Sequence, residues 1–154
     1  MATAKGWHLA QVNIGRIHAP MDDPIMAEFK AALDEINTLA EASPGFVWRL
    51  KGDSGDATSI VAFPDPLILV NLSVWADVAS LHAYVYRSMH GKFFARRESW
   101  FAKFESAHLA LWWIPAGHVP TVDEAKQRLA WLAERGPTVE AFTFRRPFPP
   151  PAAV

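Results

Sequence analysis

Residues Leu67–Trp75, with the sequence LILVNLSVW, form the clearest strand pattern in the chain. Their side chains alternate between two faces with a period of two, and one of these faces carries Leu69, Asn71, Ser73 and Trp75. Residues Trp7–Ile14 alternate in the same way and predict another strand. In that strand Gln11 and Asn13 share a face with Leu9, so we expect polar side chains within an otherwise apolar sheet face.

Helices are predicted between the strands. Asp23, followed by a proline, has the signature of a helix N-cap, and an apolar period of 3.6 predicts a helix from there to about Ala42. Asp77 is expected to cap a second helix, which bends or breaks near Gly91. A further aromatic-rich helix is expected to run to about Phe104.

The second half of the chain adds one more helix. Thr121 and Glu124 have the spacing of a capping box, and the helix they open is predicted to end at Glu134 or Arg135, before a Gly-Pro pair. Additional strands are predicted at residues 46–50, 108–114 and 141–145, and residues 59–63 are expected to add a short strand or an extension.

The predicted order of elements is β-α-β-β-α-β, followed by an extra helix and strand. This order is typical of an α+β, ferredoxin-like split βαβ fold, with an antiparallel sheet and helices on one face. One domain spans residues 1–154, of which 147–154 form an extended Pro-rich tail. Because Trp and Phe side chains would lie on the uncovered face, we expect a homodimer through the sheet faces.

Composition excludes several classes of function. The chain has 154 residues, no cysteine, and a formal net charge of -1 from 15 Lys+Arg and 16 Asp+Glu. Disulfides and thiolate chemistry are therefore absent, and the charge balance argues against nucleic acid or an anionic membrane as a partner. No membrane span and no signal peptide is evident, so we expect a cytoplasmic protein.

Five segments resemble those of an uncharacterised bacterial domain family in the dimeric α/β-barrel superfamily. They are HLAQVNI at 8–14, LVNLSVW at 69–75, YVYRSMH at 84–90, WWIPAGH at 112–118 and AFTFRRPF at 141–148. That superfamily also contains the antibiotic biosynthesis monooxygenases. The resemblance covers nearly the whole chain and implies a dimeric α/β barrel.

The resemblance also implies roles for individual residues. Monooxygenase-like members carry an asparagine on the first strand, an aromatic early in the second main helix and a histidine later in it, all facing a pocket between sheet and helices. Asn13 matches the first position, Tyr84 is the nearest aromatic to the second, and His90 matches the third. Haem-degrading members use that histidine as the iron ligand and have tryptophan where this chain has Tyr84.

His82, Tyr86 and His90 stand four residues apart, so on a continuous helix they share one edge, which Arg97 would extend. An imidazole can transfer a proton near neutral pH or bind iron, while a phenol or guanidinium can donate hydrogen bonds to a substrate oxyanion or a haem propionate. The alternative is an edge that faces solvent or a partner. Because the chain has no carboxylate cluster and lacks the zinc-protease spacing, no dedicated metal site is expected.

Two further groups are candidate substrate contacts. Gln11, Asn13, Asn71 and Ser73 could orient a small ligand, or they could satisfy one another across paired strands. Trp48, Trp112 and Trp113 could stack on a planar substrate, or they could belong to the core or to a dimer interface.

Three functions remain open at this point. The first is a monooxygenase-like oxidoreductase that acts on a planar or aromatic substrate with no evident cofactor, with His90, Asn13 and Tyr86 as catalytic residues. Gln11, Trp48, Asn71, Ser73, His82, Arg97 and Trp112 would then bind the substrate. The second is a haem b protein with His90 as axial ligand. The third is a non-enzymatic ligand-binding or scaffold dimer.

Overall fold

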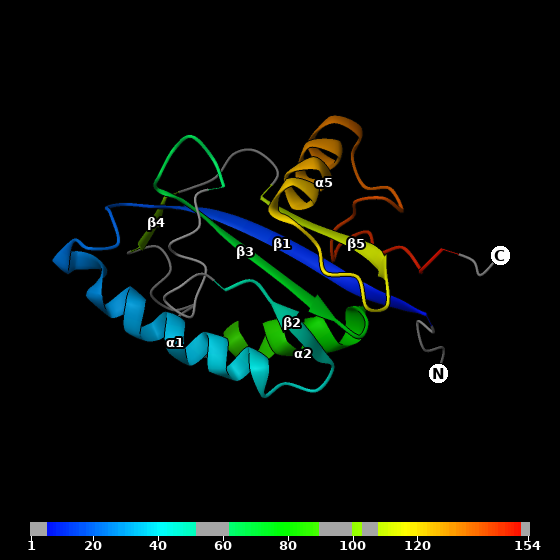
Figure 1. The fold of residues 1–154 in the computed structure, drawn as a ribbon, viewed down its shortest axis with the longest axis horizontal. Coiled ribbons are helices and arrows are strands. Elements are labelled where there is room, and N and C mark those ends of the chain that lie inside the picture. Colours follow the sequence, from blue (N-terminus) through cyan, green and yellow to red (C-terminus); the bar gives the residue numbers. More distant parts are fainter. Residues whose placement is uncertain (1–5, 52–61, 90–99, 103–107, 152–154) are drawn as a thin grey trace.

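A computed structural model describes residues 6–51, 62–89, 100–102 and 108–151 (Figure 1). Its five-stranded antiparallel sheet contains β1 (Trp7–Ile17), β2 (Phe46–Arg49), β3 (Ile68–Trp75), β4 (Phe101–Ala102) and β5 (Leu109–Pro115). The helices are η1 (Pro24–Met26), α1 (Ala27–Glu41), α2 (Val78–Met89) and α5 (Val122–Arg135). None of these helices is long and apolar enough to cross a membrane.

Strand β1 is the centre of the sheet. It pairs with β3 along one edge, and with β5 and then β4 along the other, while β2 lies outside β3. The order β5–β1–β3–β2, with α1 and α2 as crossovers, is the split βαβ arrangement. The predicted ferredoxin-like fold is therefore confirmed.

Helices α1 and α2 cover one face of the sheet, which we call the helix face. As predicted, the Asp23 carboxylate accepts a 3.0 Å hydrogen bond from the Ile25 N–H at the start of η1. At the start of α2, the Asp77 carboxylate accepts a 2.8 Å hydrogen bond from the Ser80 N–H. Phe29 of α1 and Leu81 of α2 bury their side chains against this face.

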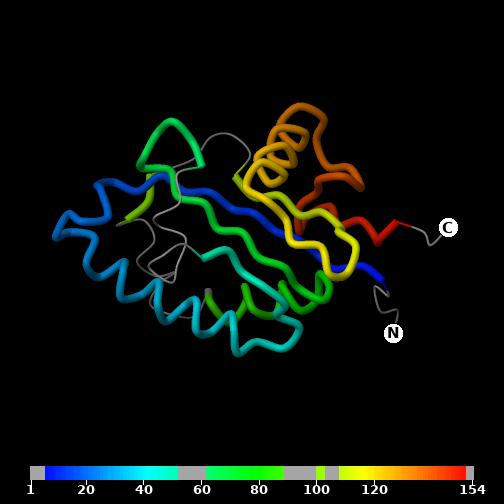
Figure 2. Tube along the Cα trace, in the orientation of Figure 1, coloured from blue at the N-terminus to red at the C-terminus, as the bar shows by residue number. Residues whose placement is uncertain are grey.

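The opposite face, which we call the far face, is covered in part by α5 (Figure 2). Ala125, Leu129 and Leu132 pack over strand residues that include Ala10 and Trp112, which are both fully buried. The expectation of helices on one face only was wrong, because the apolar stripe of α5 is buried on this chain's own sheet. Thr121 caps the helix as predicted, since its side chain accepts a 3.1 Å hydrogen bond from the Glu124 N–H.

The segment after α5 returns along the outer edge of β5. Leu111 and Phe142 exchange both backbone hydrogen bonds at 2.8 Å, and the Trp113 indole N–H donates a 2.9 Å hydrogen bond to the Phe148 carbonyl. The predicted strand at 141–145 is thus reduced to isolated bridges, of which one, between Phe142 and Leu111, joins it to β5. The backbone N–H and carbonyl of Leu111 on the outer edge of β5 are thereby paired within the chain.

The predicted aromatic-rich helix to about Phe104 is wrong at its described end. Phe101 and Ala102 form the short strand β4, which pairs with Ile17 and Arg16 at the end of β1. Gly91, His90 and Arg97, on which other predictions depend, lie outside the described residues, as does most of the predicted strand at 59–63.

Candidate functional site

Four polar side chains lie together on the helix face of β1 and β3, and we call Gln11, Asn13, Asn71 and Ser73 the amide patch. The register pairs Gln11 with Ser73 and Asn13 with Asn71, as the two-residue periods predict. The side-chain amide of Gln11, which is buried, donates hydrogen bonds to Asn71 Oδ1 at 2.7 Å and to Ser73 Oγ at 2.8 Å. Part of the patch therefore satisfies itself across the strands.

Asn13 and Asn71 are exposed although they lie at the middle of the two strands. On the same face of β1, Leu9 belongs to an apolar cluster with Leu81 of α2, whereas Ile17 belongs to a second cluster with Met26 and Phe29. The helix face is thus apolar at both ends of the strands and polar between them. Two amide groups at the centre of this face are accessible to a ligand.

One wall beside the amide patch is aromatic. The Trp75 indole N–H donates a 2.9 Å hydrogen bond to Ser73 Oγ, and the Tyr84 ring of α2 stacks on Trp75 with 4.9 Å between ring centroids. The Tyr84 hydroxyl donates to the Ile36 carbonyl of α1 at 3.3 Å. Burial raises the pKa of Tyr84 to about 12, so its phenol keeps its proton near neutral pH.

The predicted histidine and tyrosine edge of α2 lies elsewhere. His82 and Tyr86 are exposed, Tyr86 by 60%, and the His82 ring lies 5.8 Å from that of Phe144 in the C-terminal segment. Tyr84, rather than Tyr86, is the tyrosine whose ring packs beside the amide patch. His90 and Arg97 lie outside the described residues.

Arg49 is a site residue that sequence reasoning missed. It pairs with Ser73, so Gln11, Ser73 and Arg49 form one row across β1, β3 and β2. Its side chain is only 13% exposed, and its Nε donates a 3.2 Å hydrogen bond to Glu41 Oε2 at the end of α1. The ammonium group of Lys51 lies 3.3 Å from the same oxygen.

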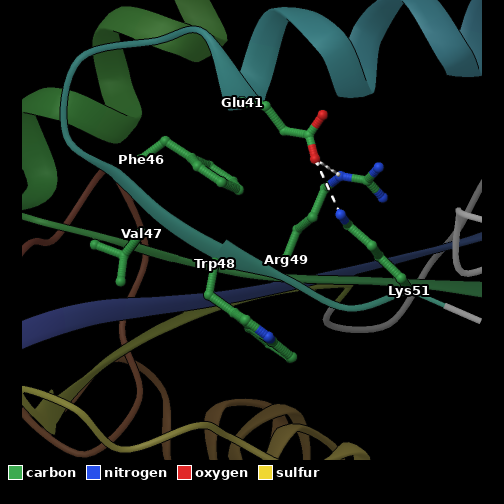
Figure 3. Close-up of a pocket in the computed structure, with 6 residues that line it drawn as sticks. All are labelled: Glu41, Phe46, Val47, Trp48, Arg49 and Lys51. Carbon is green, nitrogen blue, oxygen red and sulfur yellow. Dashed lines mark hydrogen bonds and ion pairs between the residues drawn. The ribbon is translucent and has the colours of Figure 1, made fainter.

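Arg49 and Lys51 line a hollow of about 340 Å³ beside β2, together with Glu41, Phe46, Val47 and Trp48. In Figure 3 both cationic side chains extend to Glu41, while Trp48 leaves the strand on the other side. The hydrogen bond from Lys51 is the main cause that lowers the pKa of Glu41, and the positive charge of Arg49 also lowers it. The carboxylate is therefore ionised between two cations.

Trp48 and Trp112 are not brought to the amide patch. Both belong to the far-face cluster, in which Trp112 is fully buried under α5. The Trp112 indole N–H donates to Glu124 Oε2 at 2.9 Å, and Glu124 Oε1 lies 2.8 Å from the His118 Nε2. Trp112 is thus a packing residue of α5, and only Trp113 of the three predicted tryptophans packs on the helix face.

No group of three or more potential metal ligands is found among the described residues. The amide patch offers amide and hydroxyl groups, which donate and accept hydrogen bonds without changing charge near neutral pH. It is therefore suited to orienting a polar oxygen of a ligand between apolar walls.

A family profile described as "Domain of unknown function (DUF3291)" matches residues 8–154. The chain belongs to this family. The resemblance of the sequence motifs to an uncharacterised domain family is thus confirmed. No protein with a curated function matches it significantly.

Several solved structures resemble the DUF3291 chain. A point mutant of SnoaB, a cofactor-independent oxygenase from Streptomyces nogalater, is 16% identical, with 73% of this chain and 95% of that chain covered and a TM-score of 0.42. NE2512, a protein of unknown function from Nitrosomonas europaea, is also 16% identical, with 75% and 97% covered and a TM-score of 0.43. PA3566 from Pseudomonas aeruginosa is 14% identical, with 77% and 98% covered and a TM-score of 0.38.

Proposed function

We propose that the chain is a monooxygenase-like oxidoreductase that binds a small planar substrate at the amide patch. The observation that supports this proposal is the pair of exposed amides, Asn13 and Asn71, at the middle of a sheet face that is apolar at both ends. Exposed amides fixed on neighbouring strands fit a ligand oxygen, and the apolar surroundings fit an aromatic ring.

The amides would act by stabilising charge on the substrate oxygen. An Asn13 or Asn71 N–H donates a hydrogen bond to a phenolate or enolate oxygen more strongly than to the neutral group, so the anion is favoured. Gln11 limits the motion of Asn71 by donating to its Oδ1 at 2.7 Å. The predicted proton acceptor is His90, which lies outside the described residues.

The substrate would supply the electrons for oxygen. For a methylene group conjugated to an aromatic carbonyl, loss of a proton gives an enolate that can reduce dioxygen. The overall change is CH₂ + O₂ → C=O + H₂O, in which carbon loses four electrons and the two oxygen atoms gain them. No further reductant is needed, which agrees with the lack of an evident cofactor motif in the sequence.

Oxygen uptake with an anthrone and with simple naphthols tests the proposal. We expect turnover by the wild-type protein and a loss of about 100–1000-fold in rate for Asn13→Ala and Asn71→Ala, as for removal of an oxyanion donor. Gln127→Ala changes an exposed amide on α5 and should leave the rate unchanged. If the anthrone and the naphthols bind but the wild-type protein consumes no oxygen with any of them, the result favours the non-enzymatic alternative.

Three predictions from the sequence remain open beside this proposal. Haem b binding depends on His90, and a Soret band on addition of hemin that is lost in His90→Ala would establish it. A homodimer would use the part of the far face that α5 leaves beside Trp48, so sedimentation of wild type and Trp48→Asp tests it. The cytoplasmic location also remains a prediction.

A further inference from the structure

Arg49 lines the hollow beside β2 and also stands in one row with Ser73 and Gln11 of the amide patch. Beyond Arg49, strand pairing continues through the hydrogen bond from the Leu50 N–H to the Leu72 carbonyl, at 2.9 Å. Lys51 lies just past the end of β2, and its ammonium group reaches the Glu41 carboxylate that Arg49 also contacts. Arg49 therefore stands directly beside Ser73 of the amide patch, and Lys51 joins it at the same carboxylate.

Among the described residues of this corner, two cations meet at one carboxylate. Arg49 and Lys51 share one carboxylate, and a single oxygen of Glu41 accepts from both. A third cation, Arg87 of α2, donates a 2.8 Å hydrogen bond to Ser43 Oγ, two residues after Glu41. The side chains of Lys51 and Glu41 are 52% and 39% exposed, so an incoming anion can reach this ion pair from solvent.

We propose that this corner binds an anionic group of the substrate, a carboxylate or a second phenolate, with Lys51 and Arg49 as its cations. This inference rests on the proposed function and names the class of substrate: a planar aromatic that carries a negative group on the side opposite its apolar edge. The aromatic floor is Phe46, whose ring lies 5.4 Å from that of Trp75. Without substrate, Glu41 forms ion pairs with both cations, and the anionic group of the substrate competes with Glu41 for them.

A structural role for the same cations makes a different prediction. Helix α1 has no basic residue in its last turn, so Arg49 and Lys51 could simply neutralise the negative end of that helix. In that case, substitution of Lys51 lowers the melting temperature without changing ligand selectivity. Binding measurements on a matched pair of ligands separate the two roles.

The ligands are 1-hydroxy-2-naphthoate and 1-naphthol, which differ by one carboxylate, and calorimetric titration gives their affinities. We expect wild type to bind the naphthoate at least 10-fold more tightly than the naphthol. Lys51→Gln should lower naphthoate affinity about 5–10-fold and leave naphthol affinity unchanged. Glu41→Gln removes the competing carboxylate and should raise naphthoate affinity several-fold.

Two controls make the result specific. Arg16→Gln removes a cation paired with Asp65 on an exposed part of β1, and should change naphthoate affinity less than twofold. Asn71→Ala should weaken both ligands, because it alters the amide patch itself. Equal effects of Lys51→Gln on both ligands, or none, would overturn the inference while leaving the proposed function intact. If wild type binds neither ligand at millimolar concentration, both the inference and the amide-patch site fail.

Discussion

Gln11 and Ser73 face each other on β1 and β3, and the Gln11 amide donates a 2.8 Å hydrogen bond to Ser73 Oγ in the buried part of the helix face. The same oxygen accepts the Trp75 indole N–H at 2.9 Å. One hydroxyl therefore joins the amide patch to its aromatic wall. Because Gln11 also holds Asn71, a change at Gln11 should affect both the stability of the sheet and the position of the exposed amides.

Gln11→Leu is expected to lower the free energy of unfolding by about 1–3 kcal/mol, because it removes one partner from buried polar groups. Urea unfolding measures this change. Gln127→Leu, at an exposed position of α5, should change stability by no more than about 0.5 kcal/mol. Equal stabilities of the two variants would show that the Gln11 hydrogen bonds contribute nothing net.

Glu124 should make stability depend on acid pH. Partial burial raises the pKa of Glu124, but hydrogen bonds from His118 and Trp112 and nearby positive charge together lower it by more, so the folded pKa lies below the usual value of 4.5. Such a group stabilises the fold above its unfolded pKa, and this contribution is lost as pH falls through the folded pKa. Calorimetric melting between pH 6 and pH 3 should show a steeper loss for wild type than for Glu124→Gln. Glu134→Gln, at an exposed position of α5, should follow the wild-type curve.

Gly45 should not tolerate a side chain. It joins α1 to β2 with a φ of +84°, and a Cβ there would collide with the Ser80 side chain at the start of α2. We expect Gly45→Ala to cost about 2–4 kcal/mol, from a left-handed conformation and overpacking together. Gly117→Ala has a similar φ of +96° but open space around its Cβ, so it should cost only about 1–2 kcal/mol. Chemical unfolding of both variants checks the difference.

The phenol of Tyr84 should lose its proton only at a pH well above that of an exposed tyrosine. The chain has two tyrosines, so Tyr86→Phe leaves Tyr84 as the sole phenol, and absorbance at alkaline pH follows it directly. Because burial raises its pKa, the midpoint should be at about 12 in the folded protein. In denaturant it should return to about 10. A folded midpoint near 10 would mean that Tyr84 is open to solvent rather than stacked on Trp75.

The strands and the amide patch could be predicted because their signals are local. The two-residue periods around Gln11 and Asn71 place both side chains on the face of Leu9 and Trp75, and the observed register agrees. The face on which α5 packs could not be predicted. Its apolar stripe shows that one side is buried, but the stripe carries no information about which side of the sheet receives it.

Arg49 was missed because of a bulge. Simple alternation would place Phe46 and Trp48 on one face of β2, but the register shifts between them at Val47. Phe46 consequently packs with Trp75 on the helix face while Trp48 packs on the far face, and Arg49 turns to the helix face beside Ser73. Phe101 was predicted in a helix for a different reason. Its strand pairing with Ile17 joins distant parts of the chain and leaves no periodic signal in the sequence.

The central place of β1 also sets the order in which the chain can fold. Leu9 pairs with Trp75 on one side and with Trp113 on the other, and Trp113 is synthesised only after α1, β2, β3 and α2. During translation one edge of the central strand therefore has no partner until β5 is made. Pairing between strands so far apart in the sequence slows folding, and an unpaired strand edge can pair with the edge of another chain. A chain that stops before β5 should consequently aggregate rather than fold.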